Sequence, residues 1–113
     1  MKIQFLFIPT ADLTASLALY RDNLGFTELW REGDATVALA LPGSDVQIML
    51  DAHNPDAPVG PIFIVDSLAT FHAGRPETLT VLDGPAEIPG GFLTTYQEPG
   101  GAALYVMDQS TGS

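Results

Sequence analysis

A pattern of an apolar strand, a capping residue and a short helix occurs twice in the chain, and this repeat most constrains the possible folds. Residues 12–13 in the first copy align with residues 67–68 in the second, an offset of about 55 residues. Each copy begins with an apolar run, residues 5–8 or 61–65, that is short enough for a buried strand. An offset of about half the chain indicates an internal duplication.

The two predicted helices have recognisable start and stop signals. Asp12 is expected to cap the first helix, because its carboxylate accepts from free backbone N–H groups, and Gly25 is expected to end it. Asp66 or Ser67 caps the second helix, which ends at Gly74. The first helix is predicted to bury a stripe of apolar residues at helical spacing: Leu13, Leu17, Tyr20 and Leu24.

Alternating apolar residues between turn signals predict three more strands in each half. They cover residues 27–31, 36–41 and 46–51, and then residues 78–82, 92–97 and 102–107. Residues 83–91, rich in glycine and proline, are expected to form a loop, and residues 51–60 to link the halves. The prediction is one α+β domain, residues 1–113, with module 1 at about 1–52 and module 2 at about 60–110.

Composition excludes several classes of function. The chain of 113 residues is 46% hydrophobic, so it can bury a core, and it has no cysteine for disulfides or thiolate metal sites. The chain has fourteen acidic and four basic residues, and its net charge of −10 argues against binding nucleic acid or an anionic membrane. The chain shows no signal-peptide pattern, and a cytoplasmic location is expected.

Three segments resemble the glyoxalase, bleomycin-resistance and extradiol-dioxygenase group, also called the vicinal oxygen chelate superfamily. They are Asp-Leu at 12–13, Tyr-Arg-Asp-Asn-Leu-Gly-Phe at 20–26, and Glu-Pro-Gly-Gly-Ala-Ala-Leu-Tyr-Val-Met at 98–107. The resemblance implies tandem βαβββ modules that form a curved, partly closed mixed sheet around a shared cleft. It also implies a homodimer, which exposed strand edges make physically reasonable.

Metal-using members of that group hold a divalent cation with His, Gln or Glu from the first and last strands of each module. Carried over by position, these places fall at Phe5, Met49, Gly60 and Tyr105. None is a credible ligand, because such sites need imidazole or carboxylate. The sequence therefore predicts no metal, no cofactor and no catalytic residues, and it is closest in character to the metal-free bleomycin-resistance-like members.

The remaining cleft is expected to bind a small hydrophobic or aromatic molecule, possibly cationic, which the acidic protein would attract. The predicted ligand-binding residues follow from strand alternation: Phe5, Phe7, Trp30, Gln47, Met49, Ile62, Ile64, Tyr96 and Tyr105. One alternative is a lyase, isomerase or dioxygenase with relocated metal ligands among Gln47, Asp51, His53 and Gln97. Another is a non-catalytic accessory module.

Overall fold

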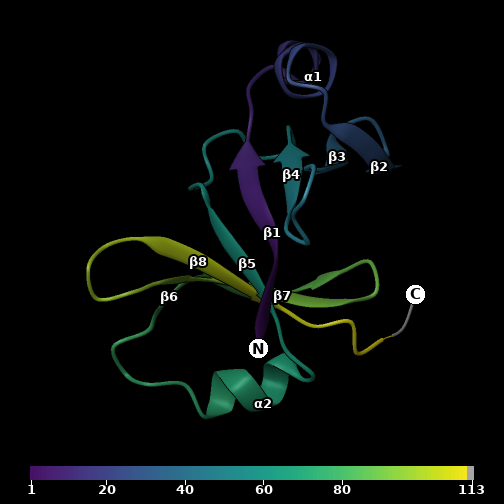
Figure 1. Ribbon diagram of the computed structural model, residues 1–113. Coiled ribbons are helices and arrows are strands. Elements are labelled where there is room, and N and C mark those ends of the chain that lie inside the picture. The colour runs from purple at the N-terminus through teal and green to yellow at the C-terminus, as the bar shows by residue number, and fades with distance from the viewer. Residues whose placement is uncertain (112–113) are drawn as a thin grey trace. The chain divides into compact units, whose positions relative to one another are not determined.

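The computed structural model describes residues 1–111 and has two compact units with the same order of elements, βαβββ (Figure 1). The N-terminal unit is Gln4–Val59, and the C-terminal unit begins at Gly60 and includes Met1–Ile3. Helices and strands both occur in each unit, which confirms the predicted α+β class and the two βαβββ modules.

The N-terminal unit forms a mixed sheet with the strand order β2-β3-β4-β1. Strand β1 runs parallel to β4, and the other neighbours are antiparallel. Its elements are β1 (Lys2–Pro9), α1 (Leu13–Leu17), η1 (Ala18–Asn23), β2 (Thr27–Glu32), β3 (Thr36–Ala40) and β4 (Gln47–Asp51).

The C-terminal unit repeats this topology with the strand order β5-β8-β7-β6. Its elements are β5 (Gly60–Ile64), α2 (Leu68–Ala73), β6 (Thr80–Ile88), β7 (Gly91–Gln97) and β8 (Ala103–Met107). Phe7 faces Met49 in the first parallel pair, and Ile62 faces Tyr105 in the second, each about 55 residues further along. The matching registers agree with the predicted duplication.

Each unit buries one face of its sheet against its own helix. In the N-terminal unit the fully or nearly buried residues of this core are Leu17, Val37, Leu39, Ile48 and Leu50. In the C-terminal unit they are Leu68, Tyr96 and Val106. Side chains one position away along the strands therefore lie on the opposite face of each sheet.

The first helix corrects one part of the predicted apolar stripe. It continues from α1 as a π-helix, η1, and Leu24 N–H donates to Leu19 O, five residues back, at 2.9 Å. The wider π turn rotates the last residues away from the sheet, so Leu24 is 54% exposed while Leu13, Leu17 and Tyr20 pack in the core. No helix in residues 1–111 is both long and apolar enough to cross a membrane.

Strand β6 corrects the loop predicted for residues 83–91. The strand continues to Ile88 and pairs with β7, although its register shifts between Val81 and Asp83 and again between Asp83 and Ala86. Gly84 has a φ of +93°, and a Cβ there would lie 2.8 Å from Leu93 O. Glycine and proline are thus accommodated as irregularities of a paired edge strand.

Candidate functional site

The face of the N-terminal sheet opposite its helix carries several of the predicted ligand-binding residues. Phe5 is opposite Gln47 and Phe7 is opposite Met49, so these four side chains share that face. In the pairing of β3 with β4, the small residues Ala38 and Ala40 are opposite Met49 and Gln47 and so lie on the same face. We call this surface the aromatic face, defined by Phe5, Phe7, Trp30, Gln47 and Met49.

Trp30 joins the aromatic face because strand β2 is irregular. The pairing with β3 shifts between Glu28, which is opposite Leu39, and Trp30, which is opposite Ala38. The Trp30 ring meets the Phe5 ring edge to face, with 6.1 Å between ring centroids and 86° between ring planes. Phe5 is only 4% exposed, whereas Trp30 is 38% exposed. Trp30 is therefore the accessible part of the ring pair.

Gln47 contributes a polar atom that the fold leaves without a partner. Its Oε1 atom is buried and makes no hydrogen bond within residues 1–111. An unpaired buried acceptor costs free energy of about 1–3 kcal/mol. A donor group that reached the atom after the neighbouring side chains moved aside would recover that cost, since an amide oxygen has two acceptor lone pairs.

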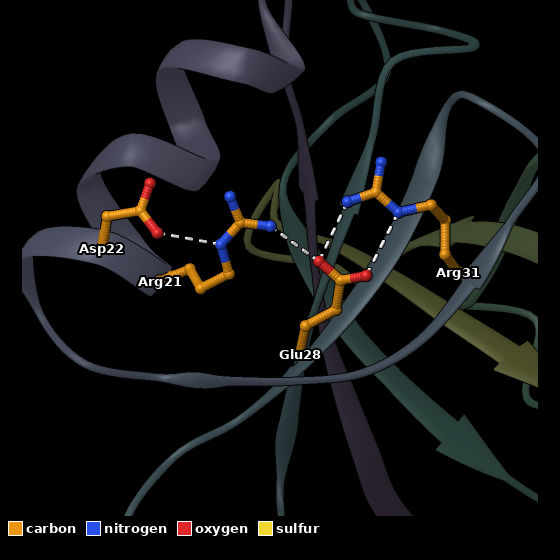
Figure 2. Close-up of polar contacts among 4 residues, drawn as sticks. All are labelled: Arg21, Asp22, Glu28 and Arg31. Atoms are coloured by element: carbon orange, nitrogen blue, oxygen red, sulfur yellow. Dashed lines mark hydrogen bonds and ion pairs between the residues drawn. The ribbon is translucent and has the colours of Figure 1, made fainter.

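An ion network lies on the other side of strand β2 (Figure 2). Glu28 accepts from Arg21 Nη1 at 2.8 Å and from Arg31 Nε and Nη2 at 3.1 and 2.9 Å, and Arg21 Nε also donates to Asp22 at 2.9 Å. The hydrogen bond from Arg31 is the main cause that lowers the pKa of Glu28, and burial opposes it. The sequence gives no local signal that Glu28 would join two arginines.

The C-terminal unit places Gly60 and Tyr105 against each other on the face opposite α2. A Cβ at Gly60 would lie 2.6 Å from Ala103 O and 3.5 Å from Tyr105 Cε2. Tyr105 is 3% exposed. A longer side chain at position 60 therefore requires a shift of the backbone of β5 or β8. Ile62 and Ile64 follow Gly60 on this face by strand alternation.

The four positions that the superfamily resemblance indicates for metal ligands carry side chains that do not suit a divalent cation. Phe5, Met49, Gly60 and Tyr105 provide neither imidazole nor carboxylate. No group of three or more His, Cys, Asp or Glu side chains within residues 1–111 is arranged to hold a metal ion.

The relocated ligands considered from the sequence have other surroundings. Asp51 accepts from Thr36 Oγ1 at 2.8 Å in a buried pair, and His53 lies exposed in the segment after β4. Gln97 in the C-terminal unit is exposed, and its Nε2 donates to Gly101 O at 3.1 Å. Asp51 and Gln97 thus each form a hydrogen bond within their own unit.

Tyr96 corrects the predicted set of ligand-binding residues. It is fully buried in the core beneath α2, and its hydroxyl is 2.7 Å from His72 Nδ1. Its ring also meets the Phe71 ring at 5.9 Å. Tyr96 is opposite Leu104, one residue before Tyr105, so the two tyrosines lie on opposite faces of the sheet. The prediction failed because the sequence pattern of this strand does not show which of its two faces packs against the helix.

Two βαβββ units with a parallel pair inside each mixed sheet define a recognised class of α+β protein. The family model described as Glyoxalase/Bleomycin resistance protein/Dioxygenase superfamily matches residues 2–104. The chain therefore belongs to this superfamily. A comparison with curated proteins gives no match.

Solved structures agree with this assignment at the level of the fold. A protein described as NAD-dependent benzaldehyde dehydrogenase from Legionella pneumophila has a TM-score of 0.74 and 13% identity, over 92% of this chain and 96% of that chain. A glyoxalase/bleomycin resistance protein/dioxygenase superfamily member from Vibrio splendidus has a TM-score of 0.64 and 18% identity, over 95% of this chain and 99% of that chain. Methylmalonyl-CoA epimerase from Mycobacterium tuberculosis has a TM-score of 0.63 and 18% identity, over 94% of this chain and 86% of that chain.

Proposed function

We propose that the chain is a metal-free small-molecule-binding protein that resembles the bleomycin-resistance members of its superfamily and sequesters its ligand. The observation that carries the proposal is the aromatic face, where the Phe5–Trp30 ring pair lies beside the unpaired Gln47 Oε1. The superfamily resemblance places the metal-ligand positions of metal-using members at Phe5 and Met49 on this face, and neither side chain can serve as a ligand.

The chemistry of the aromatic face favours a flat, partly apolar ligand that carries a hydrogen-bond donor. Aromatic rings bind planar groups by stacking or edge-to-face contact, and an exposed tryptophan also attracts cations. The net charge of −10 raises the local concentration of cationic molecules near the protein. Gln47 Oε1 would accept from the ligand's donor.

A titration with bleomycin A2 tests this function. Trp30 is the only tryptophan of the chain, so quenching of its fluorescence reports directly on the aromatic face. We expect saturable quenching, and calorimetry should find binding at least about tenfold weaker for Trp30→Ala, the loss of one aromatic stacking contact. Leu24→Ala, at an exposed position of the same unit, is the matched control and should bind as the parent does.

The two alternatives, an accessory module and an enzyme with relocated metal ligands, predict different results in binding and metal-content experiments. Absence of binding to bleomycin A2, together with no thermal stabilisation by a panel of cationic aromatic antibiotics and hydrophobic metabolites, would overturn the proposal and favour an accessory module. Metal analysis after purification without chelator should find less than about 0.1 divalent ion per chain, since imidazole and carboxylate are missing from the ligand positions. One ion per chain that is lost in Asp51→Asn or His53→Ala would favour the enzyme.

Self-association is part of the same proposal, because the superfamily resemblance implies a homodimer. Strands β2 and β6, each at one edge of the sheet of its own unit, are poor candidates for the contact, since each has a register shift and charged side chains, and β6 contains Pro85. These features oppose edge-to-edge pairing. Light scattering at increasing concentration should give the mass of two chains, and a constant monomer mass would remove the dimer from the proposal.

A further inference from the structure

We infer that Glu28 is a positioning residue for Trp30, and that it acts through the bulge at Leu29 in strand β2. The inference rests on the proposed function of the aromatic face, because it concerns how that face acquires its accessible ring. Glu28 itself lies on the other side of the sheet and does not contribute to the aromatic face.

The bulge is the reason that Glu28 and Arg31 can pair. In a regular strand, residues three positions apart point to opposite faces of the sheet. Here Glu28 is opposite Leu39 and Arg31 is opposite Val37, and both partners belong to the core beneath the helix. Glu28 and Arg31 therefore share a face, and the two hydrogen bonds between them span the extra residue, Leu29.

A second arginine, on the helix that covers this face of the sheet, also binds Glu28. Arg21, on η1, donates to Glu28 Oε1 at 2.8 Å, so this carboxylate joins the helix to strand β2 (Figure 2). Glu28 is thereby held from two directions, by Arg21 on η1 and by Arg31 on the far side of the bulge. The Glu28–Arg31 bonds form because the bulge places both residues on one face of the sheet, and a regular strand would not allow these bonds.

The same register decides where Trp30 points. Trp30 is opposite Ala38, whose side chain lies on the aromatic face and is fully buried. Without the extra residue, alternation from Glu28 would turn position 30 to the helix side and remove its contact with Phe5. A bulge that re-aims one side chain is a known device at strand edges.

The expected consequence is local rather than global. Exposed ion pairs contribute little to stability, so removal of Glu28 should leave the fold intact. The change should instead appear at Trp30, whose ring is set by the bulge. A purely structural role for Glu28 would change the unfolding transition without changing the fluorescence of the folded state.

The fluorescence experiment compares Glu28→Ala with Asp22→Ala in the full chain. Asp22 also pairs with Arg21 but has no bond across the bulge, which makes it the matched control. In Glu28→Ala we expect red-shifted Trp30 emission and acrylamide quenching that rises about twofold, because the ring leaves Phe5. Asp22→Ala should keep the parent values, and Glu28→Gln should lie between them because it retains an acceptor oxygen.

The inference is overturned if Glu28→Ala keeps the parent emission and quenching while circular dichroism shows a folded chain. Deletion of Leu29 provides a second variant, since it removes the bulge directly and should change Trp30 in the same direction. Bleomycin A2 then separates the two claims. If the parent chain does not bind it, the proposed function fails while the fluorescence still tests the positioning role. If Glu28→Ala moves Trp30 but binds as the parent does, the link to binding is wrong.

Discussion

The two βαβββ units begin their helices in different ways. In the N-terminal unit the contacts are local: Asp12 accepts from Ala15 N–H at 3.0 Å, and Thr10 Oγ1 accepts from Asp12 N–H at 3.1 Å. In the C-terminal unit Ser67 accepts from Thr70 N–H at 3.2 Å, and Asp108 adds a bond from Leu68 N–H at 2.7 Å across 40 residues. Only the second helix start therefore has a capping hydrogen bond to a residue far away in the chain.

Asp108 connects three segments of the C-terminal unit. Besides Leu68, it accepts from Phe92 N–H at 3.1 Å, and from Ser110 N–H and Oγ at 3.2 and 2.9 Å. Asp108 is 2% exposed. Burial alone would raise the pKa of its carboxyl, but the hydrogen bonds from Leu68, Ser110 and Phe92 together hold the pKa below its usual value. The residue is thus a charged anchor inside the unit.

The largest expected effect comes from removing this anchor. Asp108→Ala leaves three backbone donors, the N–H groups of Leu68, Phe92 and Ser110, without their acceptor and should lower the free energy of unfolding by about 3 kcal/mol. Asp12→Ala, which removes a local exposed cap, should cost only about 1 kcal/mol. Urea denaturation at pH 7 followed by circular dichroism measures both. Equal losses would contradict the distinction between a tertiary and a local helix start.

A second comparison concerns the first strand of each unit, where Phe5 and Gly60 occupy equivalent places. Gly60→Ala should lower the free energy of unfolding by about 2 kcal/mol, because its Cβ would meet Ala103 O at 2.6 Å. Gly74→Ala is the control, since the nearest atom to its Cβ is 3.6 Å away, and it should change stability by less than about 0.5 kcal/mol. Tolerance of Gly60→Ala would show that β5 and β8 can move apart.

A smaller effect is expected at Thr94, a buried position beneath α2. Its Oγ1 atom has no hydrogen-bond partner in the described part of the chain, and the residue is fully buried. Thr94→Val keeps the shape of the side chain and removes the unpaired hydroxyl, so it should raise the thermal midpoint and add about 1 kcal/mol of stability. Thr95→Val, at a partly exposed neighbouring position, is the comparison and should give less. A loss of stability in Thr94→Val would indicate a bridging water.

The smallest expected effect is a pH dependence due to Asp108. Because its pKa is lower in the folded chain than the reference value of 3.8, its contribution is present above that value and is lost as pH falls through the folded pKa. Urea midpoints between pH 7 and pH 3 should therefore fall more steeply for the parent chain than for Asp108→Asn. Parallel curves would assign the acid sensitivity to other carboxylates.

Much of the fold was accessible from local patterns. Apolar runs, the cap at Asp12 and the glycine at position 25 predicted the first module, and the repeat at residues 67–68 predicted the second. Leu24 and Tyr96 were placed wrongly because a π turn and the choice of strand face depend on packing. The strand through residues 83–88 was missed because glycine and proline suggested a loop.

The candidate site divides in the same way. Alternation and the superfamily resemblance identified Phe5, Phe7, Gln47 and Met49 as one set, and the structure places them on one face. Trp30 reaches that face only through the bulge at Leu29, which ladder pairing with β3 reveals and composition does not. The Gly60–Ala103 contact and the unpaired Gln47 Oε1 likewise have no sequence signal.

The sequence by itself determined the duplicated α+β modules, which depend on residue type and on short-range spacing. The superfamily resemblance supplied the expected ligand positions, and the sequence has neither imidazole nor carboxylate at them. Only the tertiary structure decided which faces are buried, how Asp108 starts α2 and where Trp30 points. Those outcomes depend on register and on contacts between residues far apart in the chain, and a one-residue shift in a strand reverses them.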